Sequence, residues 1–251
     1  MRVFPFLVSA FLFVKCSSGQ QKITPVATKP SEHIDPTADQ RVRRQQSETY
    51  CLAHGVPIFH GPNSLFTKTD SAVTLRTKNE IVDRALALLY IGLKAEGLPG
   101  KQLAAIDKDW HITKSMSPTE KTFVEATNPT DQQKADALWR YESLHVLLWT
   151  LGYIDSLSYP NIGCNVATDV AIIHALTEPT FRAKARLRSK KEILDQADLV
   201  LRLHWATEDA RIKGKPSPAR LSPDVLMERH HVLNWLIRDG DADWDNVQTN
   251  T

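Results

Sequence analysis

The residues best suited to chemistry in this chain are Arg, Glu and His side chains set inside strongly apolar segments. The candidate polar cluster consists of Arg140, Glu142, Arg202, His204, Glu228, Arg229, His230 and Asn234. A carboxylate can tune a histidine ring for proton transfer, and an arginine can bind an anionic group through paired hydrogen bonds. In a catalytic site, Glu142 or Glu228 would act on one of the two histidines while an arginine of the set holds the anion.

The same side chains also suit a purely structural role. In helical cores, the stems of Arg and Glu pack beside Trp while their charged ends pair. A buried polar group left unpaired costs about 1 to 3 kcal/mol, so such groups are normally satisfied by one another. On a helix, Glu228 and His231 are three residues apart and His230 and Asn234 are four apart, so each pair shares a face. We therefore take a buried hydrogen-bond network as the main interpretation and a catalytic pocket as the alternative.

Other chemistries have weaker support in the sequence. His230 and His231 are adjacent and point about 100° apart on a helix, so they do not readily bind one ion. The chain lacks a His-Glu-x-x-His motif, a Gly-x-Ser-x-Gly elbow, a phosphate-binding loop and a Gly-rich dinucleotide turn. We expect no metal site and no cofactor.

The charge balance argues against a nucleic-acid partner. The 31 Lys and Arg against 29 Asp and Glu give a formal net charge of +2, so there is no global field to attract a polyanion. One basic stretch is present, comprising Arg182, Lys184, Arg186, Arg188, Lys190 and Lys191. Acidic residues follow it and no aromatic side chains interleave, so we expect a solvated helix face.

Helix signals recur along the chain and must position these side chains. Ser or Thr followed three residues later by Glu or Gln indicates a helix start, and Gly indicates a stop. These signals predict helices over residues 77–97, from 117, and over 130–152, 168–176, 189–214 and 222–240, with a further basic segment at 181–188. The best alternating apolar stretch, residues 72–75, is short. The sequence predicts an all-α fold, a single compact multi-helix domain with a short irregular N-terminal segment at about 51–58.

The N-terminus has the pattern of an export signal. Arg2 precedes an apolar run over residues 3–14, and Lys15 and Cys16 are followed by small residues. The run of about 12 residues is shorter than the roughly 20 that span a bilayer. Cys16 is a candidate for lipidation, although Lys15 suits a lipoprotein signal poorly, and ordinary cleavage near residues 18–19 is an equal alternative.

These features divide the chain into a leader at 1–18, a polar Pro-containing linker at 19–40 and a helical domain at 41–251. We expect an exported protein of the cell envelope or outside the cell, not a transmembrane one, with a membrane tether if Cys16 is lipidated. An oxidising compartment would allow a disulfide between Cys51 and Cys164, but the sequence does not give their separation.

Several segments read together resemble one bacterial family. They are residues 139–144 (WRYESL), 192–195 (EILD), 202–206 (RLHWA), 209–211 (DAR), 228–230 (ERH), 233–236 (LNWL) and 244–247 (WDNV). Their order is similar to that in the family called domain of unknown function 4272, over about residues 41–251. His231, Asn250 and the leader depart from the family's usual pattern. The resemblance implies no reaction and no catalytic role for any residue.

Two functional expectations follow. The first is a non-catalytic helical binding or interaction domain of the cell envelope, with a protein as its partner. The alternative is a cofactor-free enzyme, hydrolase-like, that uses the candidate polar cluster. An enzyme should present these side chains in a solvent-connected pocket, whereas an interaction domain should bury them and expose an apolar patch.

Overall fold

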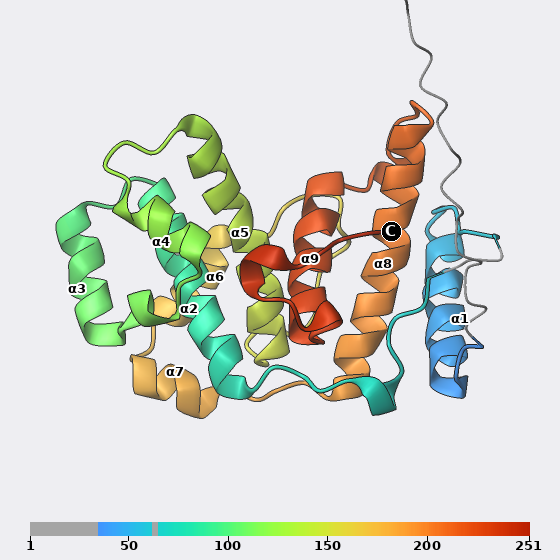
Figure 1. Ribbon diagram of the computed structural model, residues 1–251, viewed down its shortest axis with the longest axis horizontal. Coiled ribbons are helices and arrows are strands. Elements are labelled where there is room, and N and C mark those ends of the chain that lie inside the picture. The colour runs from blue at the N-terminus through green and yellow to red at the C-terminus, as the bar shows by residue number, and fades with distance from the viewer. Residues whose placement is uncertain (1–34, 62–64) are drawn as a thin grey trace, which may run out of the picture. The chain divides into compact units, whose positions relative to one another are not determined.

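The chain folds into helices joined by short connections, as the capping signals predict. The computed structural model describes residues 35–61 and 65–251, and this part of the chain contains nine α-helices, five 3-10 helices and no strand (Figure 1). The α-helices are α1 Ala38–Ala53, α2 Lys78–Ala95, α3 Gly100–Trp110, α4 Pro118–Glu125, α5 Asp131–Thr150, α6 Val166–His174, α7 Glu178–Lys184, α8 Lys190–Ile212 and α9 Pro223–Leu236. The 3-10 helices are η1 Asp70–Ala72, η2 Ile112–Ser115, η3 Pro218–Arg220, η4 Asp239–Asp241 and η5 Trp244–Asn246. The all-α prediction is confirmed.

Capping boxes define the starts of the major helices. At α8, the Ser189 hydroxyl accepts from the Glu192 backbone N–H at 3.2 Å, and the Glu192 carboxylate accepts from the Ser189 N–H at 2.9 Å. The same reciprocal bonds form at α2, α4 and α5. Each box satisfies backbone donors that the first helical turn leaves without an intrahelical partner.

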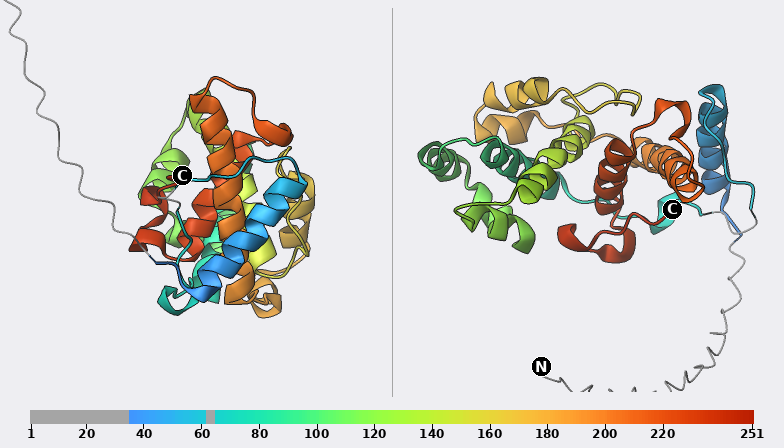
Figure 2. Two further views of the ribbon diagram at one scale, coloured as in Figure 1. Left: turned by 90° about the vertical axis from the view of Figure 1, so that its right-hand side faces the viewer. Right: turned by 90° about the horizontal axis from the view of Figure 1, so that it is seen from above.

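The helices that carry the candidate residues pack as consecutive neighbours. Within residues 34–251, α5 contacts α2 on one side and α9 on the other, α9 contacts α8, and α8 contacts α1. Figures 1 and 2 show this order, α2, α5, α9, α8 and α1, from two directions. Helices α3 and α4 pack on α2, and α6 packs on α5. Helix α9 therefore lies between α5 and α8, the two other helices that carry candidate residues.

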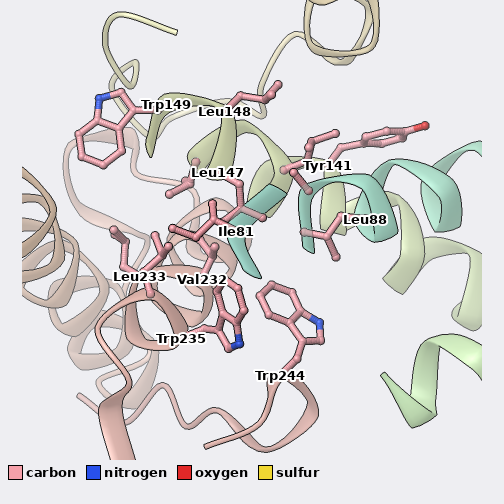
Figure 3. Packing of buried hydrophobic residues seen from close by; sticks show 14 of the residues in the cluster. Ile81, Leu88, Tyr141, Leu147, Leu148, Trp149, Val232, Leu233, Trp235 and Trp244 are labelled. Atoms are coloured by element: carbon pink, nitrogen blue, oxygen red, sulfur yellow. The ribbon is translucent and has the colours of Figure 1, made fainter. Parts of the chain in front are cut away.

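The core lies where α2, α5 and α9 meet. Ile81, Leu147 and Leu233 are buried there, one from each helix, and Trp244 of η5 closes the lower side in Figure 3. Helices α2 and α5 approach closely at Gly92, where an added Cβ would overlap the Tyr141 ring. A residue larger than glycine would therefore displace the Tyr141 ring from this position.

The N-terminal boundary of the domain differs from the sequence prediction. Helix α1 begins at Ala38, so residues 38–40, which were assigned to the linker, belong to the helix. It also continues to Ala53, into the segment expected to be irregular from residue 51. The apolar pattern misses α1 because its buried side chains include the polar Arg43 and Ser47.

Three other helices also differ from expectation. Helix α3 has no counterpart in the sequence prediction, because Pro99 at its N-cap position provides no side-chain cap. Helix α6 begins two residues before the expected Thr168, since the Asn165 side chain caps it by accepting from the Thr168 N–H at 3.1 Å. Helix α7 ends at Lys184, so the basic segment at 181–188 is only partly helical.

The length and apolar character of each helix determine whether it could cross a membrane. Among the residues that the structure describes, no helix has both the length and the apolar character needed to cross a membrane. The leader and Cys16 lie outside the described residues.

Candidate functional site

The candidate polar cluster separates into several distinct contacts. The first joins α5 to α9: Arg140 Nη1 donates to both Glu228 carboxylate oxygens, at 3.0 and 3.2 Å. The Ser143 hydroxyl donates to the same carboxylate at 2.7 Å. The side chain of Glu228 is 5% exposed and that of Arg140 is 29% exposed, so this pair is reached by solvent from the arginine side.

The second contact is a deeply buried ion pair between the same two helices. Arg229 Nε donates to Glu142 Oε1 at 2.7 Å, and these side chains are 1% and 2% exposed. The remaining Glu142 oxygen accepts from the Cys164 backbone N–H at 2.7 Å, and Arg229 Nη1 donates to the Ser158 carbonyl at 2.7 Å. The pair thus connects α5 and α9 to the segment between α5 and α6.

The two histidines of the cluster contact each other and not a carboxylate of the set. His204 Nδ1 and His230 Nδ1 are 2.9 Å apart, with the rings perpendicular. Burial lowers the pKa of His204, and burial together with the proximity of His204 lowers the pKa of His230 to about 3. Both rings are therefore neutral near pH 7, and one donates its Nδ1–H to the other. His231 lies apart from this pair, against the ring of Trp244.

The remaining two members lie elsewhere. Arg202 pairs with Asp198 at 3.0 Å on α8 and donates to the Leu65 carbonyl at 2.6 Å. Asn234 donates to the Gln248 carbonyl at 2.8 Å. The structure therefore brings together the pairs Arg140 with Glu228, Glu142 with Arg229, and His204 with His230, and leaves Arg202 and Asn234 in separate contacts.

The basic stretch does not form one helix face. Its residues are distributed over the end of α7, a non-helical connection and the start of α8. Arg182 pairs with Asp83 and Glu178, and Arg188 pairs with Glu192 at 3.0 Å. The expectation of a single solvated helix face is wrong for this reason, and much of the charge is neutralised within the fold.

A groove opens beside the Arg140–Glu228 pair, between α4, α5, α9 and η5. Its volume is about 400 Å³. Its lining is Ile91, Thr119, Glu120, Thr122, Phe123, Gln133, Asp136, Ala137, Trp139, Arg140, Met227, Glu228, Trp244 and Asp245. Trp139 and Met227 are 38% and 45% exposed. We call this hollow the aromatic groove.

The aromatic groove presents two exposed carboxylates. Its lining includes four carboxylates, of which Glu228 is paired with Arg140 and Glu120 with Arg84. Asp136 and Asp245 are exposed. Burial acts to raise the pKa of Asp245, but hydrogen bonds from Ser117 and Thr119 outweigh it and the pKa falls below its ordinary value. The Asp245 carboxylate is therefore charged at neutral pH.

A second group of chemically capable residues was missed by the sequence analysis. His145 of α5, Cys164 and Asp169 of α6 place one potential ligand atom each within 4.8 Å of one another. His145 Nδ1 lies 3.0 Å from both Asp169 oxygens. Burial, with the nearby Glu142 and Asp169 carboxylates, raises the pKa of the Cys164 thiol. The signals that could have indicated this group are Glu142 and His145 three residues apart on a helix, and Cys164 just before a helix start.

The two cysteines of the domain are both free thiols, with Cys51 buried in α1 and Cys164 partly buried. The disulfide that the sequence left open is not formed in this structure.

Comparisons with known proteins add the family and nothing about activity. Searches of curated proteins and of solved structures give no significant match. The segments that suggested the resemblance lie on α5, α8, α9 and η5, which form much of the packing described above. The chain matches the family described as "Domain of unknown function (DUF4272)" over residues 43–247, and it belongs to that family.

Proposed function

We propose that this chain is an exported, non-catalytic binding domain that holds a short segment of a partner protein in the aromatic groove. The observation that carries the proposal is the combination of exposed apolar side chains and charged carboxylates at one hollow. Trp139 and Met227 line it and are well exposed, and Asp136 and Asp245 lie among them. Exposed apolar surface of this kind, edged by polar groups, is typical of an interaction site.

The charge of the lining indicates the chemistry of the partner segment. A cation on the ligand would meet Asp136 or Asp245, while an apolar side chain beside it would pack on Trp139 or Met227. The Arg140 guanidinium, which would repel a cation, is already paired with Glu228. The segment that fits is a peptide with an apolar residue flanked by Lys or Arg, and complementary charge favours it over an acidic peptide.

The contacts of the candidate polar cluster support binding over catalysis. A hydrolase of the expected kind needs a histidine next to Glu142 or Glu228 in an open site. His204 and His230 instead pair with each other in the interior, and Glu142 is bound to Arg229. These pairs hydrogen-bond with one another between neighbouring helices, which supports a role in helix packing.

The export part of this proposal is supported by the N-terminal sequence. Arg2, the apolar run over residues 3–14 and the small residues after Cys16 support a leader that takes the domain to the cell envelope or beyond it. The partner is then a protein of the same compartment.

The test is selection of random peptides on the immobilised full chain, followed by affinity measurement with the enriched sequences. We expect apolar residues next to Lys or Arg to be enriched. Trp139→Ala should weaken binding about 30-fold, as for an interface residue worth about 2 kcal/mol. Leu52→Ala is the matched control, because Leu52 is 62% exposed on α1, outside the groove. Enrichment of acidic peptides, or binding that Trp139→Ala leaves unchanged, would contradict the proposal.

A further inference from the structure

His145, Cys164 and Asp169 come from three consecutive pieces of the fold. His145 lies in the last part of α5, Cys164 in the connection after it, and Asp169 in the first turn of α6. Their ligand atoms lie within 4.8 Å of one another. An imidazole, a thiol and a carboxylate therefore converge on one point at the edge of the domain.

The three side chains differ in burial: the carboxylate is enclosed, and the imidazole and the thiol are partly exposed. The side chain of Asp169 is 1% exposed and that of His145 is 12% exposed. Cys164 is partly buried. A buried carboxylate needs compensation, and here both of its oxygens face the imidazole nitrogen at 3.0 Å. His145 and Cys164 are each in partial contact with solvent.

Neighbouring groups hold this cluster in place. Glu142, one helical turn before His145, accepts the Cys164 backbone N–H and is itself fixed by the buried Arg229. On the other side, the Asn165 side chain caps α6 and so fixes the chain directly after Cys164. Such outer contacts orient the ligands of a metal site and reduce the cost of ordering them.

The surroundings of Cys164 are unlike those of a nucleophilic cysteine. A reactive thiolate is normally stabilised by Lys, Arg or a helix N-terminus. Cys164 directly precedes the N-cap residue of α6, but it also faces the carboxylates of Glu142 and Asp169, which oppose a thiolate. A bound divalent cation would offset the repulsion between a Cys164 thiolate and these carboxylates. Without a cation, the same repulsion disfavours the thiolate that a nucleophilic cysteine needs.

The donor set selects the type of cation. Sulfur, nitrogen and oxygen donors suit zinc and related transition metals, whereas Mg²⁺ and Ca²⁺ prefer oxygen ligands alone. In tetrahedral geometry, with bonds of about 2.0 to 2.3 Å, neighbouring ligand atoms lie roughly 3.5 Å apart. The three ligand atoms lie within 4.8 Å of one another, so the longest of these distances would have to shorten by about 1 Å when a metal binds. Rotation of the side chains provides this change.

We propose that His145, Cys164 and Asp169 bind one Zn²⁺-type divalent cation and leave its fourth position open to water. The site uses α5, α6 and the connection between them, and it is separate from the lining of the aromatic groove. Its test therefore does not depend on the proposed binding function.

The experiment uses the full chain, stripped of metal with a chelator and titrated with Co²⁺ and Zn²⁺. The sequence holds three cysteines, so the variant Cys16→Ser with Cys51→Ala leaves Cys164 as the single thiol. We expect this variant to take up one Co²⁺ and to show the thiolate-to-cobalt charge-transfer absorption. Adding Cys164→Ser should remove that absorption, while circular dichroism reports whether each variant is folded.

Zn²⁺ affinity in single variants of the natural sequence provides a second measurement. Loss of an outer partner costs about 10- to 100-fold in metal affinity, and loss of a ligand should cost at least as much. His145→Gln and Asp169→Asn should each show such a loss, while His174→Gln, an exposed histidine on α6, should not. The absence of a cobalt–thiolate band in the single-thiol variant, or full Zn²⁺ affinity in His145→Gln and Asp169→Asn, would overturn the proposal.

Discussion

At the scale of single residues, the buried charges of this domain stabilise it only as pairs. Glu142 and Arg229 are almost completely removed from water, and desolvation of two such ions costs several kcal/mol each. Their mutual attraction opposes this cost, and both Glu142 oxygens and two of the Arg229 nitrogens are hydrogen-bonded, while Arg229 Nη2 has no partner among the described residues. Removing either partner would leave the other as an uncompensated buried charge.

The lowered pKa values of two histidines determine how the free energy of unfolding should depend on pH. The pKa of His230 is lowered to about 3 and that of His231 to about 4, against about 6.5 in the unfolded chain. Between pH 4 and 6.5 the unfolded state binds more protons, so the free energy of unfolding rises with pH. It should fall by about 1.4 kcal/mol per pH unit for each such group as pH drops below 6.5.

Urea denaturation at pH 7, 6 and 5 measures this slope. His230→Gln should reduce the slope by the share of one group, and His174→Gln, at an exposed position, should leave it unchanged. A slope that is the same in His230→Gln and the parent would show that His230 is not held neutral by the fold.

The sequence indicated which polar residues lie among the packed helices but not how they pair. Arg140, Glu142, Glu228 and Arg229 were identified from their positions beside apolar residues. The actual partners, Arg140 with Glu228 and Glu142 with Arg229, depend on the register between α5 and α9. Helical periodicity indicates which face of each helix is buried. It does not determine how far one helix is shifted along the other, so the pairing could not be derived from it.

At the scale of elements, the helix starts were predictable where a capping box precedes an apolar helical pattern. The boxes at Thr77, Thr130 and Ser189 all form, because a hydroxyl and a carboxylate or amide three residues apart satisfy backbone donors of the first helical turn. Helix α3 was missed because it lacks such a cap, and α1 because it buries Arg43 and Ser47 in place of an apolar stripe.

The cap of α8 can be tested directly. Ser189→Ala removes the acceptor of the Glu192 N–H and should lower the free energy of unfolding by about 0.5 to 2 kcal/mol. Thr177→Ala is the matched control, since Thr177 is the N-cap residue of α7 but makes no side-chain cap bond. Chemical denaturation of both variants gives the comparison, and equal effects would show that the α8 cap contributes nothing specific.

At the scale of the whole molecule, α5 connects the two proposed sites. Its middle turns supply Trp139 and Arg140 to the aromatic groove, and its later turns supply His145 to the proposed metal site. The groove could not be predicted from sequence, because its lining also comes from α4, α9 and η5 and depends on how these elements pack. The His145 group involves residues much closer in the chain, but its members follow no linear metal-binding motif.

At the same scale, we propose that residues 1–18 direct export of the chain, and mass spectrometry can test this. Arg2 and the apolar run should direct the full chain out of the cytoplasm of a bacterial host, with loss of residues up to about Cys16 or Gly19. Leu12→Arg interrupts the apolar run and is the control, which should keep the complete mass and remain in the cytosol. Cys16→Ala then separates the two routes: loss of membrane association indicates lipidation, and unchanged processing indicates ordinary cleavage. Intact parent protein that retains its leader in the cytosolic fraction would contradict export, and the partner of the aromatic groove would then have to be sought inside the cell.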